Sequence, residues 1–193
     1  MALFTDMKVP KRPYRMRARA ENAAETGQRI AAAMRELAVE RFLDDITLDD
    51  VAERAGVATR TVIRRFGGRD GLIEAAFAEA SSEVAARRDE IAVGDVGSAV
   101  EAVFEDYERY GDALIMALAQ ERRHPDLLRR RLDIGRRDHW NWVARVFAPR
   151  DQLHAAQLIA ATDVYVWKLL RRDMRLSLAR AKMATAEMVG RLA

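Results

Sequence analysis

The chain contains no cysteine, which excludes disulfide bonds, thiolate metal sites and a cysteine nucleophile. Its three histidines, His124, His139 and His154, lie on separate segments, so the sequence predicts no metal site. No apolar run reaches the roughly 18 residues of a membrane span, and no signal-peptide core is found near the start. We therefore expect a cytoplasmic protein without a membrane partner.

Lysine is also scarce, because only four of the 33 basic residues are lysines. Arginine is abundant throughout, so its placement says more than its number. Up to Leu72 the sequence has 14 basic and 11 acidic residues, whereas the part after Leu72 has 19 of each. The whole net charge of +3 thus belongs to the first part, which favours a site there for a negatively charged partner.

Residues 47–66, with the sequence TLDDVAERAGVATRTVIRRF, predict two short helices around one tight turn. Thr47 and Asp50 have the spacing of a capping box, which marks the start of the first helix. Gly56 is the residue best able to take a positive φ where that helix ends. The pattern is typical of a helix-turn-helix.

The two faces of the second helix differ in character. At about 100° per residue, Val62 and Phe66 point toward the core, and Arg60 and Arg64 lie on the opposite face. Residues 54–69 contain five arginines and no acid. Such a helix is suited to a DNA major groove, although two amphipathic helices joined by a glycine also occur in helical proteins that bind no DNA.

The whole chain reads as an all-α protein of three parts. Residues 1–20 carry six basic residues, one acid and two prolines, which predicts a flexible basic arm that either contacts DNA or is an inert tail. Residues 21–72 form the helix-turn-helix domain, in which a helix from about residue 26 to 40 covers the helix pair. Residues 73–193 form a larger helical domain, with an interruption expected after Gly111 and two long final helices over 152–172 and 177–192.

The run from Ile30 to Phe77, above all DDVAERAGVATRTVIRRFGGRDGLIEAAF, closely resembles the N-terminal domain of the TetR/AcrR family of transcriptional regulators. The resemblance covers about a quarter of the chain, and the rest is similar more loosely. It implies a dimeric repressor of a palindromic double-stranded DNA operator that responds to a small molecule and whose third helix reads the major groove.

The resemblance also implies which residues contact DNA, and several of them depart from the family pattern. The usual capping serine is Ala58, the usual phosphate-binding aromatic is Ile63, and the usual histidine is Arg65. Ile63 cannot donate a hydrogen bond, so Arg65 is expected to hold a phosphate instead. The implied DNA-binding positions are Thr47, Ala58, Thr59, Arg60, Thr61, Ile63, Arg64, Arg65 and Arg69.

The C-terminal part has two expected roles, effector binding and dimerisation. Aromatic, methionine and polar side chains on the central helices suit a small apolar or cationic effector, and these are Phe104, Tyr107, Met116, Trp140, Thr162, Asp163 and Tyr165. The final helices are unusually apolar, which indicates either core packing or a homodimer interface. The interface residues on this interpretation are Leu158, Val166, Trp167, Leu170 and Met188.

The sequence therefore predicts a homodimeric DNA-binding regulator, not an enzyme, that needs no cofactor. The alternatives are a regulator without a small-molecule effector and a helical enzyme that has kept the helix-turn-helix domain of residues 21–72, here called the head, as a scaffold. No nucleophile, base or metal constellation favours the enzyme.

Overall fold

The computed structural model describes the backbone of residues 11–192 and the side chains of residues 21–192. Every regular element within residues 11–192 is helical, which confirms the all-α fold. Here η1 is a 3-10 turn, and η2 and η3 are π-helical turns. In chain order the elements are α1 (Lys11–Glu40), η1 (Leu43–Asp45), α2 (Leu48–Ala55), α3 (Thr59–Phe66), α4 (Arg69–Asp89), α5 (Val96–Gln120), η2 (Pro125–Arg129), α6 (Arg130–Phe147), α7 (Gln152–Ala161), α8 (Val164–Lys168), η3 (Leu169–Asp173) and α9 (Leu178–Leu192).

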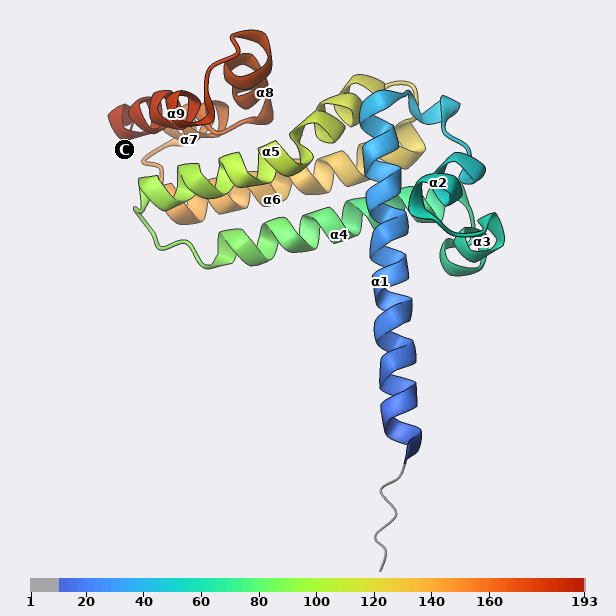
Figure 1. The fold of residues 1–193 in the computed structure, drawn as a ribbon. Coiled ribbons are helices and arrows are strands. Elements are labelled where there is room, and N and C mark those ends of the chain that lie inside the picture. Colours follow the sequence, from blue (N-terminus) through green and yellow to red (C-terminus); the bar gives the residue numbers. More distant parts are fainter. Residues whose placement is uncertain (1–10, 193) are drawn as a thin grey trace, which may run out of the picture.

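Three long helices, α4, α5 and α6, form the middle of the molecule (Figure 1). The short helices α2 and α3 lie at one end of this layer, and α7, α8 and α9 lie at the other. Helix α1 crosses the layer, contacts α2, α4 and α5, and extends well beyond it toward its N-terminus. The arrangement leaves α3 at the edge of the molecule.

The local signals in the helix-turn-helix are confirmed. The Thr47 hydroxyl accepts from the Asp50 amide at 3.1 Å, and the Asp50 carboxylate accepts from the Thr47 amide at 2.8 Å. Gly56 ends α2 with a φ of 65°, which a residue without a Cβ adopts at little cost. Val62 is fully buried in the head, as the helical period predicted.

The first helix differs from its prediction. Helix α1 begins at Lys11, so residues 11–20 continue a helix where the sequence indicated a flexible arm. Pro13 lies in the first turn of α1, where its missing amide removes no helical hydrogen bond. Residues 1–10, the other half of the expected arm, lie outside the described residues.

The helix boundaries differ from the prediction at two places: one predicted break is absent, and one break was not predicted. Helix α5 runs without interruption through Gly111, so the predicted break there is wrong. A Cβ at Gly111 would lie 2.5 Å from the Trp167 ring, so this glycine serves close packing and not a bend. The single helix expected over residues 152–172 is instead divided at Thr162 and Asp163, where α7 ends and α8 begins.

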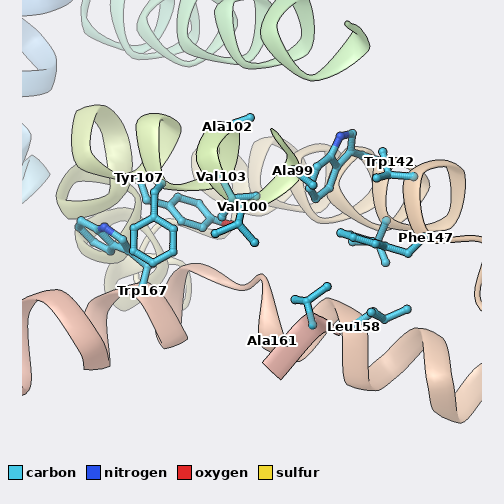
Figure 2. Close-up of a cluster of buried hydrophobic side chains, with 14 of the residues drawn as sticks. Ala99, Val100, Ala102, Val103, Tyr107, Trp142, Phe147, Leu158, Ala161 and Trp167 are labelled. Carbon is cyan, nitrogen blue, oxygen red and sulfur yellow. The ribbon is translucent and has the colours of Figure 1, made fainter. Parts of the chain in front are cut away.

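Two apolar clusters hold the fold together. One joins α5, α6, α7, α8 and α9, and Figure 2 shows Tyr107 of α5 facing Trp167 of α8 within it, with ring centroids 6.0 Å apart. The other fills the head between α1, α2, α3 and α4. This head cluster also includes Ala117, Leu128 and Leu132 from α5, η2 and α6, so the head and the body share a core.

Candidate DNA-binding face and ligand cavity

The outward face of α3 is exposed and positively charged. Arg60 and Arg64 are exposed, and neither forms an ion pair or a side-chain hydrogen bond within the described residues. Ile63, which lies beside Arg64, is 48 % exposed. Two unpaired guanidinium groups on one helical face can donate bidentate hydrogen bonds to guanine or bind phosphate.

The neighbouring charged and polar groups are used to fix α3 in place. The Thr59 hydroxyl donates to the Asp49 carboxylate at 2.5 Å, which ties the start of α3 to α2. Arg54 donates to Glu40 at 2.9 Å and to Glu36 at 3.4 Å, which ties α2 to α1. The arginine at position 54 is therefore paired within the head, in contrast to Arg60.

Not every implied DNA contact lies free on this face. The guanidinium of Arg69 donates to the carbonyl of Leu43, so this side chain is turned toward η1 and is not presented as a phosphate ligand. Arg65 is exposed, but its guanidinium lies against Gly27 of α1, where an added Cβ would come within 2.3 Å of it. Of the other implied positions, Thr61 is half-buried, Ala58 is exposed without a side-chain cap, and the Thr47 hydroxyl is engaged in its capping box.

A cavity of about 670 Å³ opens between α1, α4, α5, η2, α6 and α8. Tyr107, Trp140, Asp163 and Tyr165 line it, as the sequence predicted for an effector site. Trp140 and Tyr165 are 52 % and 58 % exposed, so these two aromatic rings lie where the cavity meets solvent. Its volume is in the range of pockets that hold drug-sized molecules.

Three predicted effector residues do not line the cavity. Phe104 is buried in the body core, and Met116 is half-buried elsewhere on α5. Thr162 is buried, and its hydroxyl donates to the Leu158 carbonyl at 2.8 Å. The helical period placed these side chains on the inner side of their helices, but it could not distinguish the core from the cavity wall.

A buried polar network, which sequence reasoning missed, forms one end of the cavity. Arg88 of α4 donates to Asp106 of α5 at 2.7 Å, and a second nitrogen of Arg88 lies 3.0 Å from His139 Nδ1. Because a guanidinium can only donate, His139 Nδ1 is the acceptor, and its Nε2–H therefore faces the Thr162 hydroxyl at 3.1 Å. Burial and then the Arg88 charge lower the pKa of His139 to about 3, so its ring is neutral at pH 7.

Two further groups in this network are perturbed by burial. Burial raises the pKa of the Asp106 carboxyl, and the guanidinium groups of Arg88 and Arg87 partly offset this rise. Burial raises the pKa of Tyr107 to about 12, and its hydroxyl donates to the Thr162 carbonyl at 3.2 Å. The sequence of α4 alone gave no hint of this network, since hydrogen-bond partners in it lie up to 55 residues apart along the chain.

Asp163, predicted to bind the effector, also has a local structural role. Its carboxylate accepts from the Tyr165 amide at 2.8 Å and so caps α8. It forms no ion pair within the described residues. Asp163 is also one of the residues that line the cavity.

Comparison with known proteins places the head in a family. Residues 30–76 match the family model described as bacterial regulatory proteins, tetR family. This match shows a tetR-family domain in the N-terminal part of the chain. Over 101 residues it is 30 % identical to the HTH-type transcriptional regulator AlkX of Mycobacterium tuberculosis, a match that covers 50 % of this chain. It spans about half the length of that relative, 48 %.

The residues predicted for a TetR-type dimer interface are mostly core residues of the single chain. Leu158, Trp167 and Leu170 are buried in the body cluster, so they are not available to a second copy. Trp167 is only 1 % exposed, and its indole N–H donates to Glu108 at 2.8 Å. Val166 is half-buried and Met188 is exposed.

Other apolar side chains of the same elements are exposed instead. Sequence periodicity missed them because an apolar helix can be packed from more than one side. They are Leu153, Leu169, Met174, Leu178 and Met183, from α7, η3, the turn after it and α9.

No group of three or more potential metal-binding side chains occurs among the described residues. Within the same part of the chain, no helix is both long enough and apolar enough to span a membrane.

Proposed function

We propose that this protein is a homodimeric repressor of the TetR family that binds a palindromic DNA operator through α3. The observation that carries this proposal is the exposed, unpaired pair Arg60 and Arg64 on the outward face of a helix whose inward face is fixed by Val62. Phosphate contacts would position the head, and the two arginines would read base edges. The hydrogen bonds from Arg54 to Glu40 and from Thr59 to Asp49 join α1, α2 and α3, which keeps that face rigid.

Dimerisation would use the exposed apolar side chains of α7 and α9. Leu153 and Met183 are 70 % and 58 % exposed on two helices that contact each other, so they can form one continuous apolar surface. A symmetric pair of heads would present two α3 helices about 34 Å apart, which matches successive major grooves. Bivalent binding would then raise operator affinity.

The cavity supports a small-molecule effector that releases the operator. Its wall is mainly apolar, with the aromatic rings of Trp140 and Tyr165 at the opening. Asp163, a lining carboxyl without a cationic partner in the described part, favours an apolar molecule or one that carries a positive charge. A ligand selective for one arrangement of the head would shift DNA affinity by its differential binding.

A gel-shift assay with the intergenic DNA beside the protein's own gene tests the proposal. The wild-type protein should shift this fragment in a salt-dependent manner, and Arg60→Ala with Arg64→Ala should abolish the specific shift. Arg180→Ala serves as the matched control, because it removes an exposed arginine from α9, far from the head. Failure of the wild type to prefer this fragment, or any selected operator, over random DNA would refute operator binding.

Sedimentation velocity tests the interface. Leu153→Glu and Met183→Glu should each produce monomers of unchanged helicity, because a carboxylate on an exposed position is costly only after association. Val39→Glu is the control, since Val39 is an exposed apolar residue of α1. Dimers in both interface variants would place the interface elsewhere.

A further inference from the structure

The backbone of Leu43 in η1 is held at both its amide and its carbonyl. Its amide donates to the side-chain oxygen of Gln120, at the end of α5, at 2.8 Å. Its carbonyl accepts from the guanidinium of Arg69, the first residue of α4. Leu43 and Gln120 are both buried, so loss of the Gln120 oxygen would leave the Leu43 amide without its acceptor in a buried position.

Gln120 and the residue after Leu43 are themselves fixed. The Gln120 amide group donates back to the Met116 carbonyl at 3.0 Å, which sets the rotamer of the side chain. Asp44 accepts from Arg123 at 2.6 Å. We call the contacts of Leu43 and Asp44 with Gln120 and Arg123 the latch; it ties the turn between α1 and α2 to the end of α5.

The latch lies between the cavity and the DNA-reading helices. Both Leu43 and Gln120 line the cavity, at the end where Met34 and Leu128 also line it. On the other side, η1 leads within two residues to Thr47, the cap of α2, and α2 packs against α3. Figure 1 shows the ends of α1 and α5 meeting above the helix-turn-helix.

We propose that Gln120 is a positioning residue that transmits occupancy of the cavity to α2 and α3 through the Leu43 amide. A molecule that fills this end of the cavity displaces the Gln120 side chain. The Leu43 amide then loses its acceptor, and the turn that sets the position of α2 is released. The inference rests on the proposed function, and it adds the route by which the head responds.

Hydrogen–deuterium exchange of the intact chain measures the latch without any DNA. Gln120→Met keeps the length of the side chain and removes the acceptor, so exchange over residues 43–66 should accelerate about tenfold, as expected when a buried amide is left unpaired. Gln157→Met, on an exposed position of α7, is the matched control and should leave exchange of the head unchanged. Asp44→Asn loosens the latch at the surface and serves as the second variant, since losing a partly exposed ion pair leaves the core intact.

A cavity-filling substitution, Ala113→Phe, is used to occupy the cavity in place of a ligand that has not been identified. Ala113 lines the cavity two turns before Gln120 on the same face of α5. In the wild-type background Ala113→Phe should accelerate exchange over residues 43–66, and in the Gln120→Met and Asp44→Asn backgrounds it should add much less. Non-additivity of this kind is not expected of a residue that only stabilises the fold.

Two results would overturn the proposal. One is wild-type exchange of the head in both Gln120→Met and Asp44→Asn. The other is an Ala113→Phe effect of equal size in all three backgrounds. Because this assay contains no DNA, it separates the two hypotheses: the exchange pattern can hold while gel shifts show no operator, in which case the proposed function fails and the latch remains.

Discussion

Replacement of Gly111 by alanine should leave the stability of the protein unchanged or lower it, although the same change in most helices is stabilising. Alanine is favoured over glycine in a helix interior by about 1 kcal/mol. At Gly111, however, the new Cβ would lie 2.5, 2.7 and 2.9 Å from three carbons of the Trp167 ring. That ring is buried and held by its hydrogen bond to Glu108, and Arg172 lies 4.4 Å above it, so it cannot move aside freely. Overpacking of this kind costs about 1–3 kcal/mol, which cancels or exceeds the helical gain.

Gly135 provides the matched control, because a Cβ there would meet nothing within 4 Å. Gly135→Ala in α6 should therefore stabilise the protein by about 1 kcal/mol. The free energy of unfolding, measured with urea, should differ between the two variants by about 1–3 kcal/mol, which corresponds to several degrees in Tm for a chain of this size. If Gly111→Ala proves as stable as Gly135→Ala, the contact with Trp167 does not constrain position 111.

Three other predictions concern DNA binding and pH. Arg64→Ala should lower operator affinity by about 1–3 kcal/mol and random-DNA affinity by less, and an equal loss on both would exclude base reading. Removal of residues 1–20 should weaken DNA binding at low salt with little change in unfolding free energy, and unchanged low-salt affinity would make this segment inert. Since the pKa of His139 is about 3 in the fold against 6.5 in the unfolded chain, the unfolded state binds the extra proton between these values. Stability should therefore fall by about 2 kcal/mol from pH 7 to pH 5, and His139→Asn should flatten that dependence; an unchanged slope would refute the assignment.

The parts of the fold that the sequence predicted are those fixed by local chemistry. A capping box at Thr47, a positive φ at Gly56 and an inward Val62 each depend on neighbours within four residues, so spacing alone is sufficient. The long apolar stripes of the body likewise indicated helices. Their ends were predicted less well, because Gly111 and Asp163 act through contacts with other parts of the chain or through a cap that periodicity does not reveal.

The residues of the candidate sites were likewise predictable only where local helical periodicity fixes their position. The exposure of Arg60 and Arg64 was predictable because the inward face of α3 defines the outward one. The hydrogen bond from Arg69 to a backbone carbonyl 26 residues away could not be predicted from spacing, and the DNA contact of Arg69 stays a prediction. An apolar pattern also cannot say which of two neighbours covers a side chain, and so Trp167 was expected at a dimer interface although it packs inside its own chain.

The head and the body share a core, which indicates that the head does not act as a separate unit. Helix α4 carries Leu72 and Ile73 into the head cluster, and Leu128 and Leu132 of η2 and α6 close it from the body side. Cutting the chain at the predicted boundary after Leu72 would expose the surface that these residues cover, at a cost of roughly 25 cal/mol for each Å² of apolar surface. Leu128 and Leu132 also line the cavity. The packing of the head and the occupancy of the cavity therefore depend on the same side chains, so a molecule in the cavity cannot displace them without disturbing the support of α2 and α3.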